Sequence, residues 1–588
     1  MKSWIPVALS LALLGCSERA PYSPISDAEP TFIYDDSALT DRIVIDEVDS
    51  IDEDDAFALS QELQNRFGLT MAPATSEEDT HIWTGFFDPE KYTQKEIISY
   101  LAQNPLIQHV EPVYTYHILD LPAGGSKGPE PVPSDRTGWV PNDPDYPKQW
   151  SFPEIGMGKA WGYTAGYNVT VAVIDTGISC QAPDLQQTIC VPGWDFVNNR
   201  EDATDDHAHG THVAGTIAQS TNNGLGVSGI AFKAKLMPIK VLAAKGGGTT
   251  VDIADGIRFA ADHGAQVINM SLGGGGKSQV LMDAINYAHA KGVTIVAAAG
   301  NDKGRVNYPA AYDNVIGVSA YQSGGAHAEF TSRGPEVDIA GPGVNILQQT
   351  LCRDRPSDRS CFAYEAFNGT SMATPHVAGV AALIISEGVT DPDAVEKVLE
   401  KTARKTDRTE NNPNLFGAGY LEAEGAVKSI GFWNGVLRAG LIVVALLFIT
   451  RSYKKIKGRT GMPMMAIGAA ISGVGLFFLP MFLHTPSLAT FILSHPLGEL
   501  DLAFIPQFHQ YLPAALPILS LALIPVTWQR PGSREFAAGV SLGLMAVTAV
   551  TLGTGAVGYG FLTLVSAAVS LAGNGLVAWM NLFWRHSR

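Results

Sequence analysis

Residues 169–177 read Val-Thr-Val-Ala-Val-Ile-Asp-Thr-Gly, an almost wholly apolar run that ends in an acid and a turn glycine. Its β-branched residues favour a strand, and the lack of polar alternation indicates that both faces of the strand are buried. Asp175 would then lie at the carboxyl end of a central strand, where open α/β sheets gather their chemistry.

Strand-like and helix-like segments alternate along the chain beyond this run. The strand-like segments are 236–241, 266–270, 293–298 and 315–318, and the helix-like segments are one opening at His209, 251–263, 279–291 and one opening at Ser371. This alternation predicts an α/β domain with a mostly parallel sheet that helices cover on both faces.

Two further motifs fall where helices are predicted to begin. Residues 209–215 read His-Gly-Thr-His-Val-Ala-Gly, and residues 369–376 read Gly-Thr-Ser-Met-Ala-Thr-Pro-His. A serine hydroxyl needs a neighbouring base, and the base needs an acid that fixes its tautomer. Ser371 would attack, His209 would transfer the proton and Asp175 would orient His209. Taken singly, the three residues could equally be a helix N-cap, a polar helix start and a turn acid.

Together the three motifs resemble the subtilisin family of serine proteases, which has the same Asp, His, Ser chain order. The resemblance covers about residues 141–428 and implies a serine endopeptidase that hydrolyses polypeptides through an acyl-enzyme, without an organic cofactor. The chain departs from the family pattern at Ala182 and Ala208, where His and Gly are usual. The alternative is a non-catalytic binding protein on the same scaffold, which the complete set of motifs disfavours.

The resemblance also assigns roles outside the triad. Asn301, at the end of an Ala-Ala-Ala-Gly-Asn segment, would donate to the oxyanion. Ser271, Leu272 and Gly273 would pair with an extended substrate, and Asn307 would lie near the base of the specificity pocket. No acid stands beside Asn307, so apolar or medium-sized side chains are expected there. His212 and His376 are expected to be structural.

Calcium is the one metal that the resemblance implies, through segments similar to the family's high-affinity site. The predicted ligands are the side chains of Asp143, Asp184 and Asn223, with Thr221, Leu225 and Val227 of the loop 221–227.

The N-terminal part has the features of an exported zymogen. Residues 1–16 combine Lys2, a short apolar run and Leu-Leu-Gly-Cys16, which resembles a lipoprotein-type signal peptide; an ordinary signal peptide with a chance cysteine is the alternative. Residues 17–40 form a predicted tether, 41–120 a small α+β unit and 121–140 a Gly, Pro and Ser-rich linker before a catalytic domain at 141–432. The unit 41–120 more weakly resembles the family's prosegment, an inhibitor and folding aid whose last strand, here 110–116, lies in the active-site cleft.

Beyond residue 432 the chain has five long apolar stretches, which predict a membrane domain of about five helices at 433–588. They are 434–450, 462–483, 511–528, 536–557 and 561–583. The loops after the first and third stretches and the C-terminal tail carry Lys and Arg, whereas the loop 484–510 has neither. The positive-inside rule therefore places the C-terminus in the cytoplasm and the catalytic domain on the periplasmic or extracytoplasmic side of a bacterial inner membrane.

The centres of these stretches carry no ionisable residue, which favours an anchor or docking module in contact with lipid over transport or signalling. The formal net charge of the 588 residues is −18, which disfavours nucleic acid as a partner.

The four cysteines after Cys16 allow three disulfide pairings, of which Cys180–Cys190 with Cys352–Cys361 is the simplest. Metal ligation is the weaker reading, because neither pair has CxxC spacing.

Overall fold

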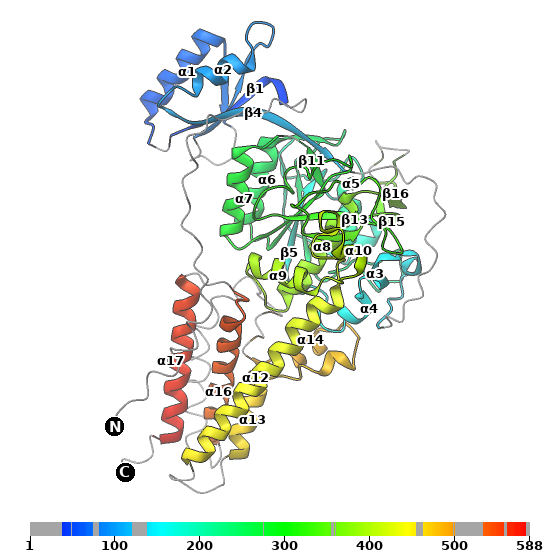
Figure 1. The fold of residues 1–588 in the computed structure, drawn as a ribbon, viewed down its shortest axis with the longest axis vertical. Coiled ribbons are helices and arrows are strands. Elements are labelled where there is room, and N and C mark those ends of the chain that lie inside the picture. The colour runs from blue at the N-terminus through cyan, green and yellow to red at the C-terminus, as the bar shows by residue number, and fades with distance from the viewer. Residues whose placement is uncertain are drawn as a thin grey trace.

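The computed structural model describes residues 38–583, with gaps at 49, 74–80, 120–137, 275, 354–357, 359, 454–461, 498, 500–501, 503–532 and 558–560. An N-terminal α/β unit, a larger α/β unit and a group of long helices follow one another along the chain (Figure 1). The predicted signal peptide, most of the tether and linker, and the apolar stretch 511–528 lie outside the described residues.

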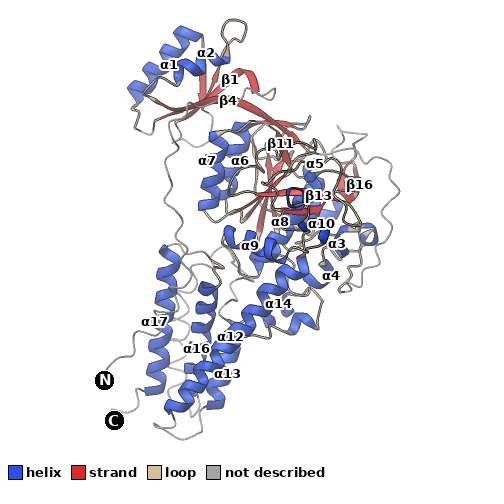
Figure 2. Ribbon diagram, viewed as in Figure 1, coloured by secondary structure: helices blue, strands red, loops and turns tan. Residues whose placement is uncertain are grey.

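The larger unit is built on a parallel sheet of eight strands, as its alternating pattern predicted (Figure 2). Seven strands follow the order β14-β13-β12-β10-β5-β8-β6, and β7 also pairs with β8. The strands are β5 (Thr170–Asp175), β6 (Ile189–Cys190), β7 (Trp194–Asp195), β8 (Lys235–Lys240), β10 (Val267–Met270), β12 (Thr294–Ala298), β13 (Ile316–Tyr321) and β14 (Ile339–Pro342). Every pairing among them is parallel.

Helices cover both faces of this sheet because alternate residues of each strand point to opposite sides. Val171 and Val173 of β5 belong to one buried cluster, with α5 (His209–Ala218) and α8 (Thr370–Ser386). Ala172 and Ile174 belong to another, with α6 (Thr250–Asp262) and α7 (Gln279–Ala290). The start of α5 contacts the end of β5 through His209 and Asp175, and the start of α8 contacts Ser271, which follows β10. Both helix starts therefore lie at the carboxyl edge of the sheet.

The N-terminal unit has its own core but shares a sheet with the larger unit. Its elements are β1 (Ala38–Glu47), α1 (Glu53–Phe67), β2 (Thr70–Pro73), β3 (Ile82–Phe86), α2 (Gln94–Leu101) and β4 (Ile107–Ile118). Ile43, Leu59 and Ile97 belong to its buried cluster. The long strand β4 leaves this unit and pairs with β11 (Leu272–Gly274) and β9 (Gly247–Thr249) of the larger unit.

Both predicted borders of the catalytic domain differ from the structure in detail. Trp139, placed in the linker by the prediction, packs edge-on against Trp161 with ring centroids 5.3 Å apart, so the unit includes residues before 141. Helix α12 (Ala423–Tyr453) begins in the core of the larger unit, where Ala426 and Val427 are fully buried, and continues past residue 433. The border at 432 therefore falls inside one helix rather than in a linker.

Three helices among the described residues are long and apolar enough to cross a membrane: Ala423–Arg451 of α12, α16 (Ser533–Gly553) and Thr563–Leu582 of α17 (Phe561–Phe583). The predicted stretch 462–483 is not one helix. Helix α13 (Met462–Gly473) ends early, and a turn, η3 (Leu479–Met481) and α14 (Leu488–Ser494) follow. Gly475, with φ +64°, and Pro480 interrupt the helical path.

Both local disulfides are present. Cys180 is bonded to Cys190, and Cys352 is bonded to Cys361. The simplest of the three possible pairings is therefore confirmed, and each bridge closes a loop of the larger unit.

Candidate active site

Asp175 and His209 form a buried pair at the edge where β5 ends and α5 begins. Nδ1 of His209 lies 2.7 Å from Oδ1 of Asp175, and both side chains have no exposed surface. The backbone N–H of Thr176 also donates to Oδ1 over 2.7 Å. A proton on Nδ1 is thereby held toward the carboxylate, which leaves Nε2 as the basic nitrogen.

The turn before His209 is organised by Asp205, a residue that the sequence analysis did not single out. Its Oδ1 accepts from the Thr176 hydroxyl and from the N–H of Ala208, and its Oδ2 accepts from the N–H and hydroxyl of Thr211. Asp205 is fully buried, and Ala208 has a φ of +100°. An acid shortly before the helix-starting histidine was the available signal, because its carboxylate can accept from the unpaired N–H groups of the first helical turn.

Ser371 is the second residue of α8 and is fully buried in this structure. Its hydroxyl donates to the carbonyl oxygen of Ser271 over 3.0 Å, and the Ser271 hydroxyl donates to the carbonyl oxygen of Ser371 over 2.8 Å. The start of a helix presents backbone N–H groups and the positive end of the helix dipole, both of which favour a developing oxyanion.

Asn301 holds a peptide carbonyl beside this helix start. Its Oδ1 accepts from the backbone N–H and from the hydroxyl of Thr370, each over 2.9 Å, which fixes the orientation of the amide. Its Nδ2 then donates to the carbonyl oxygen of Leu119 over 2.7 Å. A Cβ on Gly369 would lie 2.2 Å from that same oxygen, so only glycine leaves room for it there.

The strand that brings Leu119 to Asn301 is β4, which lies between two edges of the larger unit. Ile118 is in register with Leu272, and His117 is in register with Gly273 on one side and Gly247 on the other. Both pairings are antiparallel, and the N–H of Ile118 also donates to the carbonyl of Gly246 over 3.0 Å. An extended peptide is thus bound through its main chain on two sides.

The side chains of Tyr116 in β4 and of Leu119, which follows it, both pack against the larger unit. The Leu119 side chain lies against Gly273, where an added Cβ would come within 2.7 Å of Leu119 Cδ1 and 3.3 Å of Asn307 Cβ. The structure therefore brings Gly273, Asn307 and Leu119 together. Tyr116 is completely buried, in one cluster with Leu272, and its hydroxyl lies 3.4 Å from the carbonyl of Gly276.

The predicted calcium ligands are also gathered in one place. Asp143 and Asp184 are buried, and Asn223 bonds to both, through its N–H to Asp143 over 3.0 Å and through Nδ2 to Asp184 over 2.7 Å. Val227 donates its N–H to Asp184 over 3.1 Å. Burial raises the pKa of Asp184 to about 6, and the nearby Asp143 carboxylate adds to the rise.

His212 and His376 are held by structural contacts. His212 stacks on Phe367 and bonds through Nε2 to main-chain carbonyls, and His376 bonds through Nε2 to the Ser151 hydroxyl. Burial lowers the pKa of His212 to about 3 and that of His376 to about 4, so both are neutral at pH 7.

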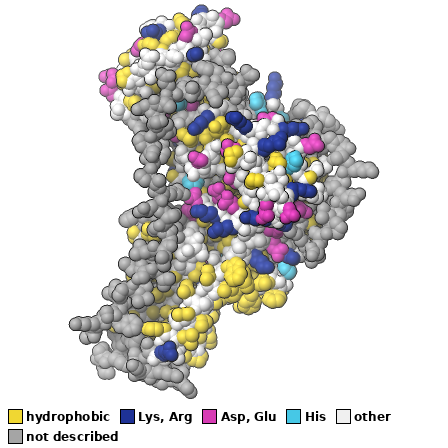
Figure 3. All heavy atoms as spheres, viewed as in Figure 1, with side chains coloured by type: hydrophobic (Ala, Val, Ile, Leu, Met, Phe, Trp, Pro, Cys, Tyr) yellow, Lys and Arg dark blue, Asp and Glu magenta, His cyan; other side chains and the backbone are white. Residues whose placement is uncertain are grey.

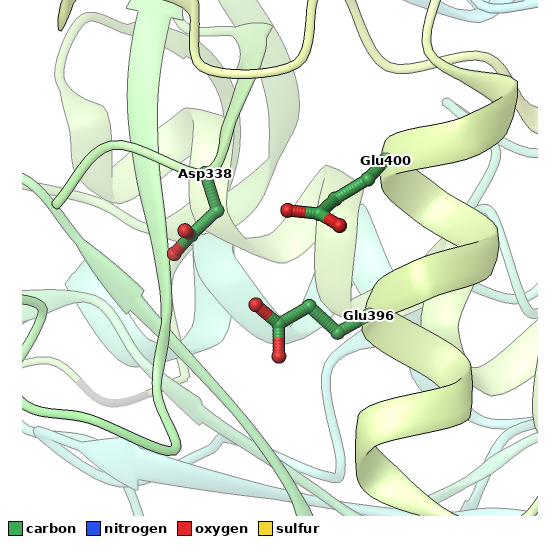
Figure 4. Close-up of side chains that lie close together, drawn as sticks. All are labelled: Asp338, Glu396 and Glu400. Atoms are coloured by element: carbon green, nitrogen blue, oxygen red, sulfur yellow. The ribbon is translucent and has the colours of Figure 1, made fainter. Parts of the chain in front are cut away.

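A carboxylate cluster that the sequence analysis missed lies away from these motifs. The carboxylates of Asp338, before β14, and of Glu396 and Glu400 of α9 (Pro392–Thr402) lie close together, with one oxygen of each within 4.8 Å of the others (Figure 4). Burial raises the pKa values of Asp338 and Glu396 to about 7, and neighbouring acids add to both shifts. Three acids alone do not define a metal site, and no function is assigned to this cluster.

Comparisons with known proteins agree with this geometry. The Subtilase family profile matches residues 166–419. Thermitase of Thermoactinomyces vulgaris is 40% identical to this chain, in an alignment that covers 50% of this chain and 98% of thermitase. Subtilisin DY of Bacillus licheniformis is 41% identical, in an alignment that covers 46% of this chain and 94% of Subtilisin DY. The crystal structure of fervidolysin from Fervidobacterium pennivorans, described as a keratinolytic enzyme related to subtilisin, aligns with a TM-score of 0.57 at 26% identity, over 68% of this chain and 62% of that one.

The fold and these similarities define a serine endopeptidase with a subtilisin-like α/β domain. The chain belongs to the subtilase family.

Proposed function

We propose that Asp175, His209 and Ser371 hydrolyse peptide bonds through an acyl-enzyme. Nε2 of His209 takes the proton of Ser371 as Oγ attacks the substrate carbonyl, and later passes it to the leaving amine. Asp175 keeps Nδ1 protonated and stabilises the imidazolium, while Asn301 Nδ2 and the start of α8 stabilise the oxyanion. Support comes from the 2.7 Å contact between His209 and Asp175 and from the peptide carbonyl held by Asn301.

The N-terminal unit is proposed to be the enzyme's own prosegment, and the chain to be an autoprocessed zymogen. The single observation that carries this proposal is the Leu119 carbonyl oxygen, which accepts from Asn301 where an oxyanion would form. The bond that Ser371 would cleave is therefore Leu119–Asp120. Leu119 directly precedes this bond, and Tyr116 stands three residues before Leu119. We therefore expect the enzyme to prefer substrates with an apolar residue before the scissile bond and a large aromatic residue three positions earlier.

The test compares the wild type with Ser371→Ala, and with Ser99→Ala as a control on an exposed helix of the N-terminal unit. Wild type and Ser99→Ala should yield a mature chain that begins at Asp120 and reacts with a fluorophosphonate, whereas Ser371→Ala should stay a precursor and not react. Processing of Ser371→Ala, or a mature N-terminus several residues away, would contradict the proposed roles of Ser371 and Leu119.

The protease domain is proposed to act on the periplasmic face of a bacterial inner membrane. The orientation is supported by the charge pattern, which places the basic loops inside, and by the predicted export signal. Membrane anchoring is supported by the three candidate spans among the described residues. Diacylation of Cys16 would add a second anchor that processing separates from the catalytic domain. A palmitate analogue should then label an N-terminal fragment in the wild type and the full precursor in Ser371→Ala.

Calcium is proposed as a structural ion of the loop 221–227. The buried carboxylates of Asp143 and Asp184 are hard oxygen donors of the kind that this ion takes. The side-chain oxygen of Asn223 accepts from the N–H of Leu225 in this structure and would turn to join them. Thr221, Leu225 and Val227 would complete the set of ligands. The raised pKa of Asp184 fits a position where a cation would offset two adjacent negative charges. The ion would stabilise the loop and take no part in the peptide-bond chemistry.

A further inference from the structure

The chain between α13 and residue 498 exposes an apolar surface below the protease domain. Residues 474–497, called here the turn segment, contain no Lys, Arg, Asp or Glu. Their exposed large side chains are Leu476, Phe478, Met481, Phe482, Leu483, Leu488, Leu493 and Leu497. Phe482 is 74% exposed and Leu493 is 53% exposed. Figure 3 shows apolar side chains gathered in the region where Figure 1 shows α12 and α14.

The opposite side of the turn segment is fixed to the protease domain. Phe491 is buried, and its ring centroid lies 5.1 Å from that of Tyr167. Nε2 of His495 lies 3.6 Å from Oε2 of Glu387, the residue that follows α8. Next to the segment, Arg438 of α12 forms a buried ion pair with Glu499. The exposed apolar side chains are therefore held in place and cannot turn inward to hide from water.

The turn segment contacts α12 at Gly435, twelve residues into the first candidate span and at the start of the apolar stretch 434–450. A Cβ on Gly435 would lie 2.2 Å from the ring of Phe477, so this ring packs directly against the backbone of α12. Helix α13 has 12 residues and is about 18 Å long, so it cannot cross the roughly 30 Å hydrocarbon layer by itself. The turn segment follows the end of α13 and therefore lies at the depth of the part of the hydrocarbon layer that α13 does not cross.

The backbone of this turn is suited to an apolar environment. The N–H of Leu476 donates to the carbonyl of Leu493 over 2.9 Å, and the N–H groups of Leu479, Phe482 and Leu483 also donate to carbonyls within the segment. Unsatisfied backbone groups are what exclude irregular structure from lipid, and these hydrogen bonds satisfy part of the backbone of the segment.

We propose that the turn segment is seated in the outer leaflet of the bilayer, in contact with phospholipid acyl chains and glycerol groups. The inference rests on the proposed membrane anchoring and extends it. Exposed apolar patches of this kind mark membrane or protein interaction sites, and the continuity with α12, where Trp433 and Leu437 are also exposed, favours lipid. The protease domain is then held on the membrane at two places, by the span and by this segment, with a fixed orientation.

The experiment uses the full chain as Ser371→Ala, so that the precursor stays homogeneous, with Cys16→Ser to leave one reactive thiol. An environment-sensitive NBD dye is attached to Phe482→Cys or Leu493→Cys, and the protein is reconstituted in phosphatidylethanolamine–phosphatidylglycerol vesicles. Leu447→Cys, exposed six residues before the end of α12, is the positive control, and Phe57→Cys, exposed on α1, is the negative control. Fluorescence loss is measured with shallow doxyl-labelled lipid and with aqueous iodide.

The expected result is loss of NBD fluorescence with doxyl lipid at positions 482, 493 and 447, and loss with iodide at position 57 alone. Iodide quenching at 482 and 493 with doxyl quenching at 447 would overturn the seating and leave the anchoring intact. Protection of 482 and 493 from both quenchers would also overturn it, because a second copy or another protein would then cover them. Iodide quenching at 447 as well would overturn the anchoring itself.

Discussion

The side-chain amide of Asn301 donates to the main-chain carbonyl oxygen of Leu119 over 2.7 Å, across two parts of the chain that are 182 residues apart. The acceptor directly follows the end of β4, and the donor follows β12 of the parallel sheet. One hydrogen bond thus links the N-terminal unit to the place where the enzyme would stabilise its oxyanion. In the proposed mechanism it is also the contact that selects the Leu119–Asp120 bond for cleavage.

Asn301→Ala should lower kcat with little change in KM, because Nδ2 acts mainly on the charge that develops in the transition state. The expected loss is about 10²–10³, a magnitude already known for such a donor in a subtilisin and not calculated for this chain. Peptide hydrolysis is measured on protein matured at a foreign cleavage site placed in the linker. An unchanged kcat would remove Asn301 from the oxyanion site.

Glu111→Gln should release active protease sooner after processing. The Glu111 carboxylate accepts from the Ser278 hydroxyl and from the N–H groups of Gln279 and Val280, at the start of α7. Loss of its charge should weaken binding of the N-terminal unit by about 10-fold, since hydrogen bonds to charged groups contribute about 1.5 kcal/mol or more. The lag between cleavage and activity measures this, with exposed Glu90→Gln as control. Equal lags in all three proteins would contradict the expectation.

Chelation with EDTA should lower the melting temperature of the mature enzyme, because an ion bound only by the folded state stabilises it. Asp184→Asn should reduce this difference between chelated and calcium-loaded protein. Differential scanning calorimetry provides the measurement, and exposed Asp302, whose carboxylate bonds to Gly304 and Ser332, offers Asp302→Asn as the comparison. If EDTA shifts neither melting nor heat inactivation, the loop 221–227 holds no calcium.

Ala208→Gly should stabilise the protein. Ala208 has a φ of +100°, a conformation that costs a residue with a Cβ on the order of 1 kcal/mol and costs glycine much less. The melting temperature should rise by about 2 °C for a domain of this size. Ala261→Gly in α6 is the matched control and should have the opposite effect, because glycine disfavours a helix. A lower melting temperature for Ala208→Gly would show that the Cβ contributes more than its strain costs.

Glu396→Gln should stabilise the protein at pH 8 and have little effect near pH 4. Burial and neighbouring acids raise the pKa of Glu396 and of Asp338 to about 7, so the folded state binds these protons more tightly than the unfolded chain. Their contribution to stability is full below about pH 4 and is lost as the pH rises through 7. Melting temperatures across this range, compared with exposed Glu410→Gln, test the sign. A constant difference at every pH would contradict it.

The parallel sheet and the serine protease class were predictable from the sequence because their signals are local. Apolar strands such as 169–174 indicate the parallel sheet, and the motifs at strand and helix ends indicate the serine protease class. The position of Leu119 was not predictable, since strand register depends on pairing between β4 and edges more than a hundred residues away. Asp205 and Asp338 were missed because a single acid in a loop has no periodic pattern. The stretch 462–483 was predicted as one span because composition alone does not separate a membrane helix from an apolar turn.

Helix α8 has Ser371 near one end and Glu387 just beyond the other, where His495 of the turn segment meets it. Its 17 residues span about 25 Å. With the turn segment in the outer leaflet, Ser371 is held at a fixed height of up to this length above the lipid. A membrane-anchored polypeptide would need a stalk of about seven extended residues before its first bond came within reach. Bonds closer to the bilayer would be spared by geometry alone, whatever their side chains.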